Sequence, residues 1–226
     1  MKIGIVIPAY NVGNKLSSVL LKTLTYVPAR DIYVIDDGST DSTAEVATCR
    51  GVVLLRHDKN RGKGEALKSG FKLALADDHD GIITMDGDGQ HDPDYIPDFI
   101  SRMENTTCDL VIGVRSFRIG KMPFDRIFSN IMSSLVISAF VKKIIRDTQC
   151  GYRLYRSAVL RELTILSSHY EVETELLVRT FWNGWGIAFC PIPLIYESYR
   201  SHIQRFVDTK RFCQLVLRLI REKQSK

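Results

Sequence analysis

Two aspartates that follow a short apolar run are the residues of this chain best suited to chemistry. Asp86 and Asp88 lie in the stretch Asp-Gly-Asp-Gly-Gln-His-Asp-Pro at residues 86–93, directly after the apolar run at residues 81–85. The run predicts a buried strand, so both carboxylates should emerge at its carboxyl end, where open α/β sheets place ligands. Gln90 can add a neutral oxygen. Because hard cations such as Mg²⁺ or Mn²⁺ prefer oxygen ligands, we expect a metal and diphosphate site here.

The same stretch also has a purely structural interpretation. Asp92 before Pro93 is a typical start for a helix, which the pattern predicts over residues 93–103. An acidic, glycine-rich turn could serve only to cap that helix. The other motifs of the chain must therefore decide between the two interpretations.

Two further loops follow predicted strands and carry groups that suit a nucleotide. Asp37 follows the run at residues 32–35 and can accept hydrogen bonds from a ribose or a base, although Asp36 beside it could simply cap a helix. In the loop at residues 60–64, the glycines would let the backbone approach a phosphate, and Lys63 supplies positive charge. Gly-Lys-Gly alone is a weak signal, and the loop lacks the spacing of a Walker motif.

The elements that must position these loops alternate along the chain. Strands that alternate with helices imply right-handed βαβ units and a mostly parallel sheet, with its loops gathered at one edge. The second helix should begin near Ser42, with Ser39 or Thr40 as its cap. The predicted strands are residues 2–7, 32–35, 52–55 and 81–85.

Length and composition favour a single domain over residues 1–226. Hydrophobic residues make up 45% of the chain, and no linker or repeat divides it. Five cysteines without Cys-x-x-Cys spacing predict neither a disulfide framework nor a zinc site, which fits a reducing cytoplasm. There is no leader pattern at the first residue, and no apolar stretch reaches the ~20 residues of a spanning helix, so we expect no membrane crossing.

Charge divides the chain into two unlike halves. Residues 1–113 hold 12 Lys and Arg against 17 Asp and Glu, whereas residues 114–226 hold 19 against 9. The basic half suits a polyanionic partner such as nucleic acid, an anionic membrane surface or a phosphorylated substrate. We do not expect nucleic acid, because no recognition motif is present and the acidic half would repel phosphates.

Two apolar stripes in the basic half predict amphipathic helices. One runs over residues 123–146 and ends in Lys142, Lys143 and Arg146, and the other recurs over residues 212–219 among basic side chains. Together they could lie on an anionic bilayer, which would make the protein cytoplasmic and peripheral at the inner face of the membrane. Alternatively, the stripes complete the core or form the face of a homodimer.

Six motifs follow one another along the chain: Pro8-Ala9-Tyr10-Asn11, Asp36-Asp37-Gly38-Ser39-Thr40-Asp41, Asn60-x-Gly62-Lys63-Gly64, the stretch 86–93, Gly113-x-Arg115, and Asp147-Thr-Gln-Cys-Gly151-Tyr-Arg153. In order and spacing they resemble the family 2 inverting glycosyltransferases, most nearly the branch of dolichyl-phosphate mannose synthase and the polyprenyl-phosphate glycosyltransferases. The resemblance extends to about Ile203.

The resemblance implies both a fold and a reaction. The fold would be α/β of GT-A type, with a Rossmann-like, mostly parallel sheet flanked by helices and with C-terminal amphipathic helices. The donor would be a GDP- or UDP-sugar with Mg²⁺ or Mn²⁺, and the acceptor a polyprenyl or dolichyl phosphate in cell-envelope biosynthesis. Residues 1–113 would then bind the nucleotide sugar, and residues 114–226 would bind the acceptor and face the membrane.

The resemblance also implies a role for each matching residue. Two positions depart from the family pattern. Val12 stands where the family usually has Glu, which removes one hydrogen-bond acceptor for the ribose or base. The basic residues that the family places late in the chain for the diphosphate are displaced, and Arg200, Ser201 and Arg205 are the nearest candidates. The nucleotide-sugar site would comprise Pro8, Tyr10, Ile35, Asp37, Lys63, Asp86, Asp88 and Arg200. The metal would be held by Asp86, Asp88 and Gln90. The catalytic residues on the acceptor side would be Arg115, Arg126 and Asp147.

The acceptor decides what Asp147 must do. A phosphate monoester is largely ionised at neutral pH and needs positioning by arginines rather than deprotonation. A hydroxyl, as in envelope polysaccharide synthesis, needs a general base, and Asp147 would then contribute roughly 10²- to 10⁴-fold. Asp147 could instead only form an ion pair with Arg153. A catalytically inactive nucleotide-sugar-binding protein is the remaining alternative.

Overall fold

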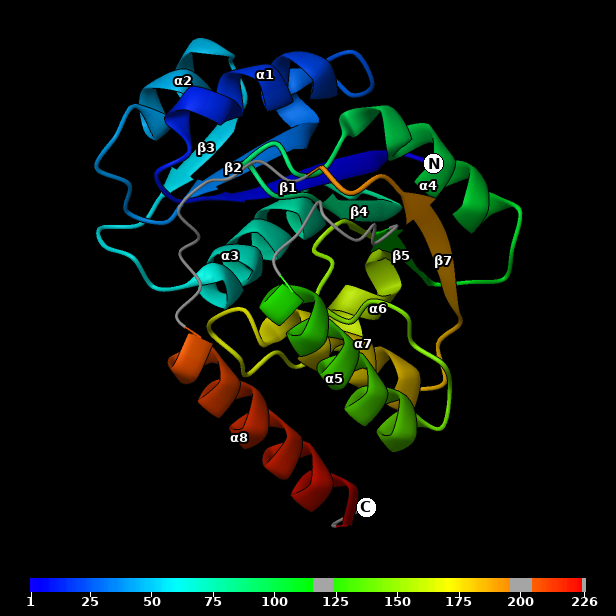
Figure 1. The fold of residues 1–226 in the computed structure, drawn as a ribbon. Coiled ribbons are helices and arrows are strands. Elements are labelled where there is room, and N and C mark those ends of the chain that lie inside the picture. Colours follow the sequence, from blue (N-terminus) through cyan, green and yellow to red (C-terminus); the bar gives the residue numbers. More distant parts are fainter. Residues whose placement is uncertain (116–123, 196–204, 225–226) are drawn as a thin grey trace.

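One mixed β-sheet forms the centre of the protein (Figure 1). This computed structural model describes residues 1–115, 124–195 and 205–224, without the side chains of residues 124–128 and 205. Within them the sheet has seven strands in the order β3-β2-β1-β4-β6-β5-β7. The strands are β1 (Ile3–Ala9), β2 (Ile32–Asp36), β3 (Val53–Arg56), β4 (Gly81–Thr84), β5 (Leu110–Arg115), β6 (Arg153–Arg156) and β7 (Ile187–Ile192).

Helices cover both faces of this sheet. Helices α1, α2 and α4 pack on one face, and α3, α5, α6, α7 and α8 pack on the other (Figure 1). The α-helices are α1 (Gly13–Thr23), α2 (Thr43–Cys49), α3 (Lys63–Ala76), α4 (Ile96–Glu104), α5 (Phe124–Val141), α6 (Ser157–Glu162), α7 (Val172–Trp182) and α8 (Arg205–Gln224). Two short 3₁₀ helices are η1 (Ala29–Asp31) and η2 (Pro93–Tyr95).

The four apolar runs form the four strands that they predicted. β1 pairs in parallel with β2 on one side and β4 on the other, and β3 pairs in parallel with β2. Both faces of β1 are buried, with Ile5 packed in the core towards α1 and Val6 in the core towards α3. This burial explains why the run is apolar throughout rather than alternating.

Strand β6 runs against its neighbours and was not expected from the sequence. It pairs antiparallel with both β4 and β5, whereas β5 and β7 pair in parallel. Its first residue, Arg153, lies opposite Thr84 at the end of β4. The segment at residues 147–152 therefore reaches the same edge of the sheet as the carboxyl ends of β4 and β5.

The C-terminal helix α8 contributes to the core along one side only. Leu215 and Leu219 are buried, and the Arg218 guanidinium lies 3.1 Å from the carboxylate of Glu175 on α7. Leu217 remains 56% exposed. Among the described helices, none combines the length and the apolar character that a membrane span requires.

Candidate active site

Asp86 and Asp88 lie just beyond the end of β4. The Asp86 amide donates to Nδ1 of the buried His91 at 3.0 Å, and burial lowers the pKa of His91 to about 4. Gln90 donates to the Asp88 carboxylate from its backbone at 3.0 Å and from its side-chain amide at 2.8 Å. Asp92 caps the 3₁₀ turn η2, as its structural interpretation predicted.

The two carboxylates fit a divalent cation that also binds a diphosphate. Burial and the neighbouring charge of Asp86 raise the pKa of Asp88, so the pair carries negative charge at a cost that a cation would relieve. No group of three or more His, Cys, Asp or Glu side chains suited to a metal occurs in the described part of the chain. Mg²⁺ is commonly held by one or two carboxylates together with substrate phosphates, which matches this donor set.

Lys63, the first residue of α3, places its ammonium group beside Asp86. Its ammonium lies 2.6 Å from an oxygen of Asp86 and 2.6 Å from Oε1 of Glu173 on α7. Burial acts to lower the pKa of Lys63, but the two carboxylates outweigh it and hold that pKa above its usual value. The lysine is therefore charged beside the proposed metal ligands.

The glycines beside Lys63 permit close packing of a second segment of the chain. Gly62 has a φ of +99°, and a Cβ on it would collide with the backbone oxygen of Ser168. A Cβ on Gly64 would lie 2.6 Å from the carbonyl oxygen of Ser167. The segment that precedes α7 thus packs directly on this loop, and the glycines permit that packing.

Asp37 holds the same loop from the other end. Its carboxylate accepts the backbone N–H groups of Arg61 at 2.9 Å and Gly62 at 2.8 Å, and Nδ1 of His57 lies 2.7 Å away. The expected cap of α2 differs, because Asp41 rather than Ser39 or Thr40 accepts the amide of Thr43. A nucleotide that contacted Asp37 would share a carboxylate that already orders the Lys63 loop.

Arg115 and Asp147, two of the residues expected on the acceptor side, lie together in a second cluster. Nε and Nη2 of Arg115, at the end of β5, donate to the two oxygens of Asp147 at 2.7 and 2.9 Å. Nδ2 of Asn130 on α5 donates to Asp147 at 3.1 Å, and the Asp147 side chain is fully buried. The alternative pairing with Arg153 is wrong, because Arg153 donates to the backbone carbonyls of residues 148, 150 and 173.

The remaining expected residues lie in three different settings. Pro8 is paired in register with Ile35, and the Ile35 side chain is fully buried in the core, so only its backbone could meet a nucleotide. Tyr10 is partly exposed just beyond β1. Arg200 lies outside the described residues, as does the side chain of Arg126, whose backbone belongs to α5.

Comparison with known proteins identifies the family. The sequence profile described as glycosyl transferase family 2 matches residues 4–164. The chain belongs to glycosyl transferase family 2. The predicted resemblance is thus confirmed, and with it the expectation that the protein is a glycosyltransferase.

Several family members align over most of their length. An undecaprenyl-phosphate mannosyltransferase of Micrococcus luteus is 32% identical, over 86% of this chain and 84% of its own. A dolichyl-phosphate hexose transferase of Haloferax volcanii is 29% identical, over 90% of this chain and 87% of its own. A UDP-N-acetylglucosamine–dolichyl-phosphate N-acetylglucosaminyltransferase of Methanococcus voltae is 28% identical, over 87% of each chain.

Solved structures confirm the predicted fold class. A glucosyl-3-phosphoglycerate synthase from Mycobacterium tuberculosis, in complex with Mn²⁺, UDP-glucose and phosphoglyceric acid, superposes with a TM-score of 0.72. The alignment covers 88% of this chain and 72% of that chain at 23% identity. This family 2 member therefore has the expected α/β fold of GT-A type, with helices on both faces of a mostly parallel sheet.

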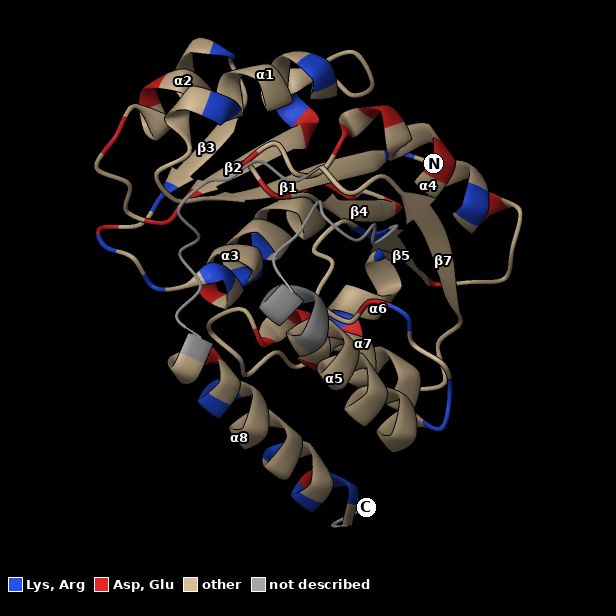
Figure 2. Cartoon of the chain, in the orientation of Figure 1, with Lys and Arg blue, Asp and Glu red and all other residues tan. Residues whose placement is uncertain are grey.

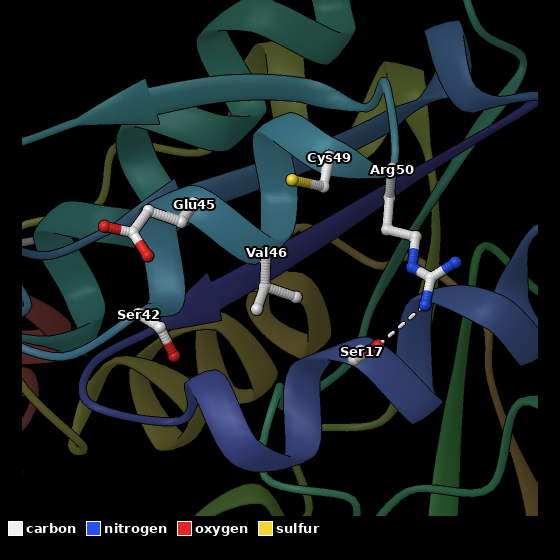
Figure 3. A pocket seen from close by; sticks show the side chains of 6 residues that line it. All are labelled: Ser17, Ser42, Glu45, Val46, Cys49 and Arg50. Atoms are coloured by element: carbon white, nitrogen blue, oxygen red, sulfur yellow. Dashed lines mark hydrogen bonds between the residues drawn. The ribbon is translucent and has the colours of Figure 1, made fainter.

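A surface hollow elsewhere in the glycosyltransferase does not belong to this site. Figure 3 shows it beside α1 and α2, where the Arg50 guanidinium donates to the Ser17 hydroxyl at 2.8 Å. Its lining contains no residue that the motifs assigned to donor, metal or acceptor. The residues that line it are Ser17, Ser42, Glu45, Val46, Cys49 and Arg50.

Proposed function

We propose that this glycosyltransferase moves a sugar from a GDP- or UDP-sugar to a polyprenyl or dolichyl phosphate, with Mg²⁺ or Mn²⁺ as cofactor. The relatives named above that carry an activity in their names act on polyprenyl or dolichyl phosphates, and they align over more than four fifths of both chains. The structural neighbour was solved with Mn²⁺ and a UDP-sugar, which supports the donor class and the cofactor.

The proposed phosphate acceptor rests on one observation: both carboxylate oxygens of Asp147 already accept hydrogen bonds within the protein. Both oxygens of its carboxylate accept from Arg115, and Asn130 donates as well. A general base needs an oxygen directed at the proton that it removes, whereas this carboxylate is fully buried and serves to orient an arginine. A phosphate acceptor, which is already largely ionised at neutral pH, needs such an arginine and no base.

The residues suggest how the reaction proceeds. A phosphate oxygen of the acceptor attacks the anomeric carbon, the bond from that carbon to the β-phosphate oxygen breaks, and the nucleoside diphosphate leaves with the bonding electrons. Arg115, oriented by Asp147, would align the attacking phosphate. Lys63 would stabilise the negative charge that develops on the leaving diphosphate. A divalent cation held by Asp86 and Asp88 supplies further stabilisation of the same charge when bound.

The first half of helix α5 supports a membrane-bound acceptor, because its apolar side chains face outward, whereas Ile137 and Val141 in the second half pack in the core. The buried side includes Asn130, Ser133 and Ser134, whose polar groups bond to one another and to the segment 147–149. The apolar side is exposed: Leu135 is 58% accessible, and Ile131, Met132 and Val136 lie beside it along the helix. Exposed apolar side chains on α5 beside the Arg115–Asp147 pair suit an acceptor embedded in a bilayer.

Basic residues accompany the exposed apolar ones. Lys142, Lys143 and Arg146 follow α5 and are exposed, with the 81% exposed Ile144 among them. Lys and Arg also recur along α8 (Figure 2), where Phe206 is 92% exposed. Apolar side chains surrounded by cations complement an anionic lipid surface better than they complement a second copy of this basic face.

The first experiment is a transfer assay. The protein is incubated with a panel of UDP- and GDP-sugars and a short polyprenyl phosphate, with Mg²⁺ or Mn²⁺ and with EDTA, and nucleoside diphosphate and glycolipid are measured together. Metal-dependent glycolipid formation is the expected result. Nucleotide release that depends on an added sugar hydroxyl, without any glycolipid, would refute the lipid acceptor and make Asp147 a candidate base.

Flotation with anionic liposomes tests the membrane contact. Leu135→Glu and Leu217→Glu should reduce the fraction of protein that floats, because each places a carboxylate on the proposed contact face. Leu21→Glu is the matched control, since Leu21 is 50% exposed on α1 at the opposite face of the sheet. Wild-type protein that stays entirely in the lower fraction, or that elutes as a dimer whose formation Leu135→Glu abolishes, would contradict the membrane contact.

A further inference from the structure

Glu173 is a buried carboxylate for which the family motifs supply no role. It lies in the first turn of α7, where an acidic residue would ordinarily serve only the helix dipole. Its side chain is 7% exposed, and Oε1 lies 2.6 Å from the ammonium of Lys63. Burial raises the pKa of Glu173, and a buried carboxylate of this kind is retained in a fold when a cation compensates it.

The position of Glu173 is fixed independently of Lys63. Nη1 of the fully buried Arg153 donates to the backbone carbonyl of Glu173 at 2.6 Å. The hydroxyl of Thr84 donates to the carbonyl of Gly151 at 2.7 Å, which holds the 147–153 motif against the end of β4. Glu173 is thus tied to the motif that also carries Asp147.

Gly151 fits this arrangement closely. A Cβ at this position would lie 2.6 Å from Oε1 of Glu173, 2.8 Å from Nζ of Lys63 and 3.3 Å from Oδ1 of Asp86. The backbone therefore covers the three charged groups without space for a side chain. Such packing restricts the positions that the Lys63 ammonium can occupy.

We propose that Glu173 is a positioning residue for the donor: it holds the Lys63 ammonium beside Asp86, where the diphosphate of the nucleotide sugar binds. This inference rests on the proposed nucleotide-sugar donor and is independent of the acceptor.

The physical reason lies in the competition for Asp86. In the structure Lys63 contacts both Asp86 and Glu173, and a divalent cation on Asp86 would take over the first of these carboxylates. Glu173 then keeps the lysine in place. Lysine has a long flexible side chain, and a fixed cation stabilises a developing anion better than one that must first be ordered.

Donor binding without turnover tests the proposal. UDP and GDP are titrated into the protein by calorimetry in the presence of Mn²⁺, and the tighter of the two is used for the variants. Glu173→Gln keeps the shape and removes the charge, and should weaken nucleotide binding by about 10- to 100-fold, as losses of supporting contacts commonly do. Glu173→Asp, which keeps the charge, should recover part of the loss.

Glu175→Gln is the matched control. Glu175 is also buried on α7, but its carboxylate pairs with Arg179 at 2.8 Å and with Arg218 at 3.1 Å instead of with Lys63. This variant should lower the melting temperature and leave nucleotide affinity within about twofold of the wild type. An equal loss of affinity in Glu175→Gln would mean that any buried charge on α7 matters, and would overturn the proposal.

A cycle with Lys63→Met separates positioning from a general structural effect. If Glu173 acts through Lys63, adding Glu173→Gln to Lys63→Met should cause no further loss of affinity. A full additional loss in the double variant, or wild-type affinity in Glu173→Gln alone, would overturn the inference. A wild-type protein that binds the nucleotide but makes no glycolipid would refute only the proposed acceptor.

Discussion

Removal of the Asp147 carboxylate should reveal how much the Arg115 pair contributes to folding. In Asp147→Leu the Arg115 guanidinium, whose side chain is only 15% exposed, loses the Asp147 carboxylate, which costs about 3 kcal/mol at the lower end of values for broken buried pairs. The Asn130 amide, 3.1 Å from Asp147, would be left without this acceptor, at about 1 kcal/mol more. A loss of about 4 kcal/mol corresponds to a fall in melting temperature of roughly 8 to 16 °C for a chain of this size.

A double-mutant cycle by urea unfolding provides the assay. Arg115→Met added to Asp147→Leu removes the buried charge that has lost the Asp147 carboxylate, so the double variant should regain about 2 kcal/mol or more relative to Asp147→Leu. The single losses would then fail to add. Additivity within about 0.5 kcal/mol would refute the reasoning, because it would mean that the two charges are not coupled in the folded protein.

The same residue separates the two mechanisms when Asp147→Asn is assayed. The amide keeps the shape and can still accept from Arg115, so an orienting role predicts mainly a higher KM for the lipid phosphate and an unchanged pH profile. A base would be lost outright, with a fall in kcat of roughly 10²- to 10⁴-fold. Product formation measured from pH 5.5 to 8.5 distinguishes the two.

Three further predictions follow from the donor side. Asp88→Asn should abolish metal-dependent nucleotide binding in calorimetry, and unchanged affinity with Mn²⁺ would show that the metal site is misassigned. The same variant should raise the melting temperature in EDTA. Burial and the charge of Asp86 raise the pKa of Asp88, so its charged form opposes folding as the pH rises above the ordinary carboxyl range. His91 has a pKa lowered to about 4 by burial, so stability in EDTA should be complete above pH ~6.5 and fall as the pH drops towards 4, and a His91→Gln variant should show a smaller fall. Gly151→Ala should weaken nucleotide binding because its Cβ would lie 2.8 Å from the Lys63 ammonium, whereas Gly51→Ala, with nothing within 4 Å of the added carbon, should leave affinity unchanged.

The sequence could predict those parts of the fold whose strands and helices have a clear local hydrophobic pattern. The parallel strands β1 to β4 are continuous apolar runs, and each is followed by a helix with its own periodicity. Strand β6 gives no such signal, since four residues with an arginine at both ends resemble a loop. Arg153 is buried because three backbone carbonyls accept its guanidinium, and partners that distant cannot be inferred from composition.

In the candidate site, too, local motifs could be read from the sequence, whereas contacts between distant residues could not. Asp86, Lys63 and Asp147 stand in short motifs and could be named from the sequence. Their pairings could not, because Lys63 meets Glu173 across 110 residues and Asp147 meets Arg115 across 32. The outward apolar face of α5 was predicted as a stripe, but its orientation depends on the polar side chains that the 147–149 segment engages.

The antiparallel strand β6 also has a consequence for the order in which the chain can fold during synthesis. In the sheet of the described residues it lies between β4 and β5, so β5 and β7 are hydrogen-bonded to the first four strands only through it. When residues 110–115 leave the ribosome, the strand that they must pair with on this side is still about 40 residues from being made. Until β6 is inserted, β4 and β5 each present an unpaired edge, the kind of surface that promotes aggregation. The strand that joins the two parts of the sheet follows directly on the segment that brings Asp147 to Arg115, so completion of the sheet and assembly of this pair depend on the same stretch of chain.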